Sequence, residues 1–349
     1  MLTDPRHSPI GTPTAWEPLT HNTANQATGG IWRVTGPGGT AILKHATPTG
    51  QGAAHWPAST DPRHWNYWQR EYLAYTTGYA AQYGKATGLG APALLAAGQR
   101  PDGSRELWLD NVTGTPGPDW TTTQLADLAH HLGATQAQLA NAPELPWHSR
   151  RFLRTYAGRR DFPDIPWNHP LAAAHWDADL RDGLRMIWEK RTELFTLAET
   201  LPQTRCHLDL WPLNLIWPTS KNGPVLLDWS FTGTGAIGED IANLIADTFL
   251  DGLQPVHRLP QTETALTNAY LTGLNTTAHH NETTVRKAIA ATGAAKYCWL
   301  APTMLTSLAN GTPTTSADYD TETDNAAVLD RRAPILTMLV RWAHTALDN

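Results

Sequence analysis

The sequence has few of the features that mark secreted, membrane-spanning or disulfide-rich proteins. It holds two cysteines in 349 residues, Cys206 and Cys298, which form neither a disulfide framework nor a metal-ligand spacing. We expect both to be buried thiols in a reducing cytoplasm. No segment approaches the ~18 apolar residues of a membrane span, and the first residues lack the apolar core of a secretory signal. The net charge of -6 gives no overall attraction for nucleic acid or anionic membranes. We therefore expect a cytoplasmic monomer or homodimer that binds neither.

The first part of the chain has short β-type segments separated by glycine and proline. The turn GPGG at 36–39 precedes an apolar segment that ends at Lys44. Gly29 and Gly30 are expected earlier in the chain, in the first hairpin turn. The segment 61–84 is predicted to be a helix that starts at Asp-Pro. Strands are predicted at 30–34, 40–44, 91–99 and 105–112. The pattern indicates an antiparallel sheet with one helix.

From Asp119 onward the apolar spacing is helical. Only residues 206–230 interrupt it with strand-like segments, LIW and PVLL. Helices are predicted near 119–141, 149–160, 176–200, 237–251, 261–274, 283–309 and 324–347. We therefore expect an α+β fold with a small antiparallel-sheet lobe, residues 1–112, and a larger helical lobe, residues 113–349.

Polar residues with a specific spacing lie within the apolar segment 207–214, HLDLWPLN. His207, Asp209 and Asn214 fall in register with the catalytic loop of protein kinases, H-R-D-L-x-x-x-N. In phosphoryl transfer the Asp accepts the proton of the acceptor hydroxyl, and the Asn reaches a Mg²⁺ ion on the phosphates. The spacing predicts these roles for Asp209 and Asn214.

A second acid, Asp228, follows the strand-like PVLL, which can pair with LIW across the turn 219–223. This is where a metal-binding Asp belongs in a kinase. Carboxylates at the ends of apolar segments are costly to bury without a counter-charge, and Mg²⁺ with ATP would supply it. We therefore predict that Asp228 and Asn214 hold Mg²⁺.

The first part of the chain offers the remaining elements of a nucleotide site. Lys44 ends AILK, which matches the V-A-I-K pattern whose Lys meets the α- and β-phosphates. Glu71 lies in the predicted helix and could pair with Lys44. Gly29 and Gly30 would let the backbone approach the phosphates. Chance does not account for the order in which these elements occur along the chain: a Gly turn, Lys, Glu, His-x-Asp-x₄-Asn and a final Asp.

Together these motifs resemble the aminoglycoside phosphotransferase and choline kinase-like family, which has the protein-kinase fold. The family loop H-G-D-x-x-x-x-N and the following I-D-x strand end match residues 207–229, and GEDIANLI at 238–245 is similar to the family's next helix start. Leu208 stands where the family often has Gly. The resemblance implies a bilobal protein-kinase-like fold that uses ATP, or another nucleoside triphosphate, with Mg²⁺.

The resemblance also implies roles for further residues. Asp240 would cap a helix and brace the catalytic loop, and His207 would brace the loop by hydrogen bonding. The chain order places the adenine-binding hinge at the backbone of Leu109, Asp110, Asn111 and Val112.

The function that these residues favour is transfer of the γ-phosphate of ATP to a hydroxyl of a small molecule, such as an antibiotic, a sugar or an amino alcohol. One alternative is a Ser/Thr kinase acting on a peptide in a natural-product pathway of the lanthipeptide kind. Another is a nucleotide-binding pseudokinase, although the base and both metal ligands are present. The arginines of 149–160, SRRFLRTYAGRR, would be a solvated helix face or would attract an acidic acceptor. Which of the 16 tryptophans line a pocket stays open.

Overall fold

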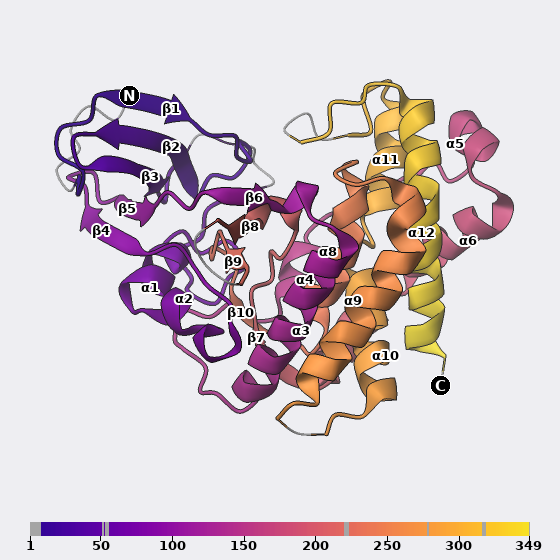
Figure 1. Cartoon of the computed structure of the whole chain (residues 1–349). Helices are drawn as coiled ribbons and strands as arrows, with labels where there is room; N and C mark the ends of the chain where they lie inside the picture. Colours follow the sequence, from indigo (N-terminus) through magenta and orange to yellow (C-terminus); the bar gives the residue numbers. More distant parts are fainter. Residues whose placement is uncertain are drawn as a thin grey trace. The chain divides into compact units, whose positions relative to one another are not determined.

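Figure 1 shows the computed structural model of the chain, which describes residues 8–50, 52, 56–219, 223–277, 279–315 and 319–348. The chain packs into two compact units. The first unit comprises Met1–Pro116, Leu145–Ser149 and Asn214–Thr232, and the second comprises Gly117–Glu144, Arg150–Leu213 and Gly233–Asn349. Two later segments therefore return to the N-terminal unit, one of which carries Asn214 and Asp228.

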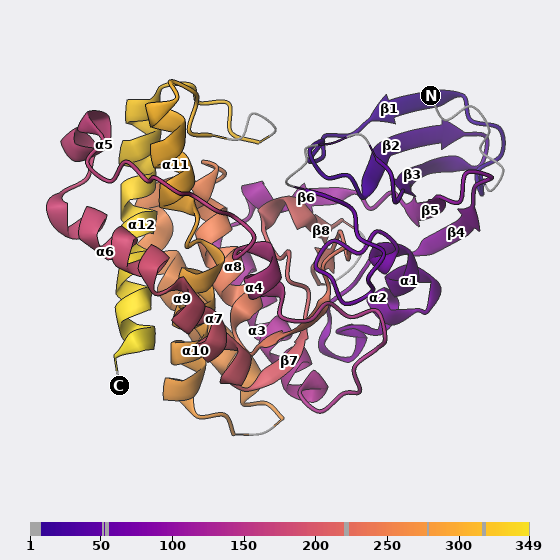
Figure 2. The ribbon, with the colours of Figure 1, turned by 180° about the vertical axis from the view of Figure 1, so that it is seen from behind.

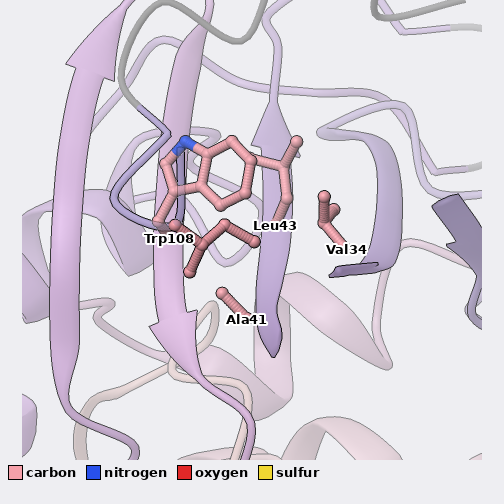
Figure 3. Close-up of a cluster of buried hydrophobic side chains, with 5 residues drawn as sticks. Val34, Ala41, Leu43 and Trp108 are labelled. Atoms are coloured by element: carbon pink, nitrogen blue, oxygen red, sulfur yellow. The ribbon is translucent and has the colours of Figure 1, made fainter. Parts of the chain in front are cut away.

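The first unit is built on a five-stranded antiparallel sheet with the order β1-β2-β3-β5-β4. Its strands are β1 Ala15–Pro18, β2 Thr28–Gly36, β3 Gly39–Ala46, β4 Leu94–Gln99 and β5 Arg105–Asp110. Ala41 and Leu43 of β3 pack with Val34 and Trp108 in the buried core of the sheet (Figure 3). Because side chains alternate along a strand, the next residue, Lys44, lies on the opposite face. The sheet thus presents the predicted phosphate-binding lysine away from its own core.

The first unit also contains two short helices, α1 Arg70–Thr76 and α2 Tyr79–Gln82, and a smaller sheet. That sheet has the order β6-β8-β9 and comprises β6 Gly114–Pro116, β8 Leu215–Pro218 and β9 Val225–Leu226. The antiparallel register pairs Leu215 with Leu226, so the predicted pairing of LIW with PVLL is confirmed. Residues 220–222 of the expected turn lie outside the described residues.

Two expectations for the first unit are wrong. Gly29 and Gly30 lie in β2, at a register shift, and not in a turn. A Cβ at Gly29 would lie 2.3 Å from His45 Nδ1, and one at Gly30 would lie 2.1 Å from the Trp32 ring, so these side chains require the glycines. The helix does not start at Asp61–Pro62 but at Arg70, because the buried Arg70 guanidinium binds the carbonyls of 62, 64 and 65. Those carbonyls are thereby held in turns.

The second unit is mainly helical, with one two-stranded sheet of β7 Gln203–Cys206 and β10 Gly233–Ala236. Its helices are α3 Thr122–Leu139, α4 Phe152–Tyr156, α5 Pro170–His175, α6 Ala178–Glu189, α7 Arg191–Thr200, α8 Glu239–Leu250, α9 Leu259–Leu274, α10 Glu282–Lys296, α11 Leu300–Ala309 and α12 Asn325–Leu347. Figure 2 shows this unit from behind, where α10 packs against α7 and α12. Short 3₁₀ turns span Lys85–Thr87, Gly117–Asp119, Pro212–Asn214 and Val256–Arg258.

Thr121 caps α3 through a capping box with Gln124. The helix then crosses α9 at close range, since a Cβ at Gly133 would lie 2.3 Å from the Tyr270 carbonyl oxygen and one at Gly273 would lie 2.0 Å from that of His130. Small residues at both contact points let the two backbones touch. The crossing supports α3, which packs against β7, the strand that leads into the predicted catalytic loop.

Two predicted helices are each divided in the structure, at Lys190 and at 297–299, and α5 was not predicted. The second division has a cause in the sequence. In a continuous helix the N–H of residue 302 would bond to the Cys298 carbonyl, but Pro302 has no N–H and its ring would clash there. Both cysteines are buried free thiols, as expected. Among the described helices, none has the length and apolar content needed to cross a bilayer.

Candidate active site

The first unit brings together three of the predicted site residues around the ammonium of Lys44. Lys44 Nζ lies 2.6 Å from Glu71 Oε2 and 3.2 Å from Asp228 Oδ2. The predicted Lys44–Glu71 ion pair is therefore present. Helix α1 carries Glu71, and β3 carries Lys44 on the face opposite the sheet core. Trp229 N donates to Glu71 Oε1 at 3.3 Å, which ties the segment after β9 to the same carboxylate.

Burial and charge act in opposite directions on these three groups. Burial alone would lower the pKa of Lys44, but the carboxylates of Asp228 and Glu71 outweigh it and the net pKa is raised. Burial raises the pKa of Glu71 to about 7, against the opposing effect of Lys44. Burial would also raise the pKa of Asp228, yet Lys44 and hydrogen bonds from Ser230 hold it below its usual range. Asp228 is therefore the carboxylate that stays ionised at neutral pH.

Asn214 and Asp228 are brought close by backbone pairing of β8 with β9. Asn214 directly precedes β8, and its carbonyl accepts a 2.8 Å hydrogen bond from Leu227 N. Asp228 is the next residue and has a left-handed φ of 56°. The carboxylate of Asp228 and the side-chain amide of Asn214, carried by paired segments of backbone, offer the kind of oxygen ligands that suit Mg²⁺, which takes few protein oxygens and completes its shell with phosphates and water. No cluster of three or more His, Cys, Asp or Glu residues that could hold a metal occurs among the described residues.

Residues 207–213 of the predicted catalytic loop lie in the second unit, and Asp240 holds the start of this segment. Asp240 Oδ2 accepts from His207 N at 2.8 Å, and Oδ1 accepts from Leu208 N at 2.7 Å. The expected brace is thus present. The expected helix cap is not, because Asp240 lies inside the first turn of α8 and Gly238 occupies the N-cap. Leu208, buried, takes a left-handed φ of 68°, a conformation that glycine adopts without strain.

A group of buried ionisable residues lies beneath this loop. Lys296 Nζ donates to the Leu208 carbonyl at 3.4 Å. Burial raises the pKa of Asp240 to about 6, although the amides of the loop and then Lys296 oppose it. Burial and then the charge of Asp240 raise the pKa of Glu239 to about 8. Sequence reasoning missed Lys296 and Glu239, since nothing in their local patterns distinguishes them from ordinary helix residues. Asp209 follows Leu208 directly and is half-buried.

The expected hinge follows the end of β5. Leu109 is buried within the sheet, and Asp110 ends the strand. Asp110 N donates to the Ala93 carbonyl at 2.9 Å, and Val112 N donates to the Asp110 carbonyl at 3.1 Å. These two N–H groups are therefore used within the protein, so contacts to adenine would have to come from the other backbone groups of the segment. Gly29 and Gly30, covered by His45 and Trp32, do not form the expected phosphate turn.

Comparison with known proteins agrees with this arrangement. The sequence model of the phosphotransferase enzyme family matches residues 31–271, whereas no curated protein sequence matches the chain. Among solved structures, the chain is similar to an amicoumacin kinase, hAmiN, in complex with AMP-PNP, Ca²⁺ and Ami (12% identity, 91% of this chain and 89% of that chain covered, TM-score 0.52). It is also similar to aminoglycoside phosphotransferase APH(4)-Ia (12% identity, 94% and 95% covered, TM-score 0.50). A third is choline kinase LicA from Streptococcus pneumoniae (13% identity, 95% of each chain covered, TM-score 0.50).

At such identities the structural similarity establishes the fold, a kinase-like arrangement of an antiparallel-sheet unit and a helical unit, as the sequence predicted. The family match covers well over half of the chain and includes every predicted catalytic and metal-binding residue. The chain belongs to the phosphotransferase enzyme family.

Proposed function

We propose that this enzyme is an ATP- and Mg²⁺-dependent kinase that phosphorylates a hydroxyl of a small molecule. The observation that carries the proposal is the pair of carboxylates, Glu71 and Asp228, bound to the ammonium of Lys44. A buried lysine held by a helix glutamate, beside an ionised aspartate at a strand end, is the arrangement that positions phosphates in kinases. Burial of three charged groups carries a desolvation cost that the packing of a sheet does not require.

In this proposal the first unit binds the nucleotide. Lys44 orients the α- and β-phosphates, with Glu71 holding its ammonium in place. Asp228 and Asn214 would hold Mg²⁺, which supplies neutralisation of the phosphate charge when bound. The backbone of 109–112 is assigned to the adenine. The choice of ATP over other nucleoside triphosphates follows from the family resemblance. The test therefore compares ATP with GTP.

The second unit supplies the catalytic loop and the acceptor pocket in this proposal. Asp209 orients the acceptor hydroxyl and accepts its proton as the new O–P bond forms. The bond from the γ-phosphorus to the bridging oxygen breaks, and ADP leaves with that electron pair. His207 and Asp240 hold the loop so that Asp209 is positioned, and neither takes part in proton transfer. The transition state of phosphoryl transfer is loose, so positioning and charge contribute most of the rate.

The test is nucleoside-triphosphate consumption against a panel of alcohols, with ATP and GTP compared and serine- and threonine-containing peptides as a separate arm. Asp209→Asn should reduce turnover by roughly 10²–10⁴, the usual contribution of a general base, while calorimetry shows little change in ATP·Mg²⁺ affinity. Asp127→Asn, at an exposed carboxylate on α3, is the matched control and should keep full activity.

Full turnover in Asp209→Asn with any acceptor would refute the assigned base. Turnover confined to the peptide arm would move the acceptor class from small molecules to peptides. Nucleotide binding without turnover in every arm would indicate a pseudokinase. His207→Ala should lower the unfolding temperature together with activity, because its buried ring belongs to the loop's support.

A further inference from the structure

The division between α10 and α11 places three consecutive residues in different surroundings. Tyr297 faces the catalytic loop: burial, then Asp247, Tyr156 and Asp209, raise the pKa of its phenol. Cys298, the next residue, faces two guanidinium groups. Burial raises the pKa of its thiol to about 12, and Arg191 and Arg160 partly oppose this. The two arginines therefore lie near Cys298, directly next in sequence to Tyr297, the residue that lies near Asp209.

Both arginines have the guanidinium carbon close to the face of an indole ring. The Arg160 guanidinium carbon lies 3.2 Å from the ring centroid of Trp299, and that of Arg191 lies 3.8 Å from the ring centroid of Trp188. Stacking keeps a guanidinium in place while leaving its edge able to bind a planar oxyanion. Arg160 also lies 5.6 Å from the ring centroid of Tyr156, which links it to Tyr297.

The arginines of this unit fall into two groups, and Arg160 and Arg191, like Arg181, Arg185 and Arg258, belong to the group without a carboxylate partner among the described residues. Seven arginines pair with carboxylates: Arg150, Arg151, Arg154, Arg286, Arg331, Arg332 and Arg341. Within the described part of the chain, neither Arg160 nor Arg191 has a carboxylate at ion-pair distance. Burial accordingly lowers the pKa of Arg160, with no carboxylate to oppose it. Within the segment 149–160, Arg150 and Arg151 are thus solvated as the sequence suggested, whereas Arg160 is not.

Two hydrogen-bond donors at this place have no acceptor among the described residues. They are Nη1 of Arg160 and Nε1 of Trp299, both enclosed and carried by the stacked pair. Enclosed donors without acceptors are rare in folded proteins and costly. An oxyanion can accept from a guanidinium N–H and an indole N–H together, by charge-assisted hydrogen bonds.

We propose that Arg160 and Arg191 bind an oxyanion of the acceptor, a carboxylate or a phosphate, beside Trp299. The acceptor is then an anionic hydroxyl compound. This proposal rests on the proposed function, since it takes the acceptor hydroxyl to lie at Asp209. The proposed subsite is positively charged. Tyr156 and Tyr297 lie between it and Asp209 of the predicted catalytic loop.

A binding experiment tests the subsite apart from catalysis. The protein, with the nucleotide site saturated by AMP-PNP and Mg²⁺, is titrated calorimetrically with benzoate, phenyl phosphate and benzamide. We expect both anions to bind and benzamide not to bind, with comparison of the two anions separating carboxylate from phosphate. Arg160→Met should weaken anion binding about ten- to hundredfold, the usual effect of losing a hydrogen bond to a charged group. Arg160→Lys should restore part of it. Arg151→Met, at a side chain that is 62% exposed and paired with Glu199, is the matched control and should bind as the wild type does.

A turnover experiment connects the subsite with the acceptor. The para isomers of hydroxymethylbenzoate, hydroxymethylbenzamide and hydroxymethylbenzylamine differ in charge at one end and share the hydroxyl. We expect the carboxylate compound to have a kcat/KM about ten- to hundredfold above that of the amide in the wild type, and this advantage to disappear in Arg160→Met.

Equal binding of benzoate by wild type and Arg160→Met would overturn the proposal, as would preference for the amine. A variant that only loses thermal stability and keeps its charge preference would likewise show that Arg160 has a structural role alone. If AMP-PNP does not bind and no alcohol is phosphorylated, the proposed function fails, while anion binding by the protein without nucleotide still decides whether the subsite exists.

Discussion

Replacement of Glu239 by Gln is expected to stabilise the protein in a pH-dependent way. Glu239 is the first residue of α8 and is 5% exposed. One oxygen, Oε2, accepts from Ala236 N at 3.2 Å, and Oε1 has no acceptor or donor contact among the described residues. Burial, and then the charge of Asp240, raise the pKa of this carboxyl from 4.5 to about 8. The folded protein therefore keeps it protonated at neutral pH.

The sign and size of the effect follow from the two pKa values. A group whose pKa is higher in the folded state contributes stability that is complete below its unfolded pKa and disappears as pH rises through its folded pKa. For Glu239 this window runs from pH 4.5 to about 8. At roughly 1.4 kcal/mol per unit, the loss over the window is at most about 4–5 kcal/mol. In the Glu239→Gln variant the neutral glutamine side chain has nearly the shape of the protonated acid. The variant protein therefore does not lose this stability as the pH rises.

The assay is urea unfolding of wild type and Glu239→Gln at a series of pH values between 4 and 9, chosen to span that window. The two proteins should be about equally stable at the acid end, and the variant should become progressively more stable by up to several kcal/mol at the alkaline end. Glu282→Gln is the control, because Glu282 is also the first residue of a helix, α10, but is 63% exposed. Its effect should stay below about 1 kcal/mol, the size of a helix-dipole contribution. A pH-independent difference for Glu239→Gln, or a loss of stability above pH 7, would refute the reasoning.

Further predictions concern the nucleotide site and the helix crossing. Lys44→Met should weaken ATP·Mg²⁺ binding and turnover, because it removes the cation assigned to the phosphates, and it should lower the free energy of unfolding, because the carboxylates of Glu71 and Asp228 lose their counter-charge; unchanged affinity by calorimetry would contradict the assigned role. Removal of divalent ions with a chelator should abolish nucleotide binding, and Mg²⁺ or Mn²⁺ should restore it; tight metal-independent binding would contradict the assignment of Asp228. Gly273→Ala should lower the free energy of unfolding by about 1–3 kcal/mol, as overpacking does, since its Cβ would lie 2.0 Å from the His130 carbonyl oxygen. An unchanged urea midpoint would show that α3 and α9 can separate.

The sequence alone was enough to predict the residues of the site, because that information is local. The spacing of His207, Asp209 and Asn214 predicts a kinase-like loop, and the hairpin that follows brings the backbone at Asp228 close to that at Asn214 through short-range strand pairing. Alternation in β3 decides that Lys44 points away from the sheet core. Each of these features depends on residues within one short stretch of the chain, and the longest such stretch runs from Asn214 to Asp228.

Tertiary structure decided the features that depend on distant partners. Arg70 donates to the carbonyls of Trp147 and Ser230, which are 77 and 160 residues away, and its buried guanidinium stops a helix that the local pattern favoured. The brace by Asp240 and the placement of Lys296 beneath Leu208 likewise join segments far apart in the chain. The residue type of a charged side chain does not reveal whether the side chain is solvated or paired with a buried partner. Only the folded chain determines which partner it meets, because burial makes an unmatched charge costly and so selects the contacts that remain.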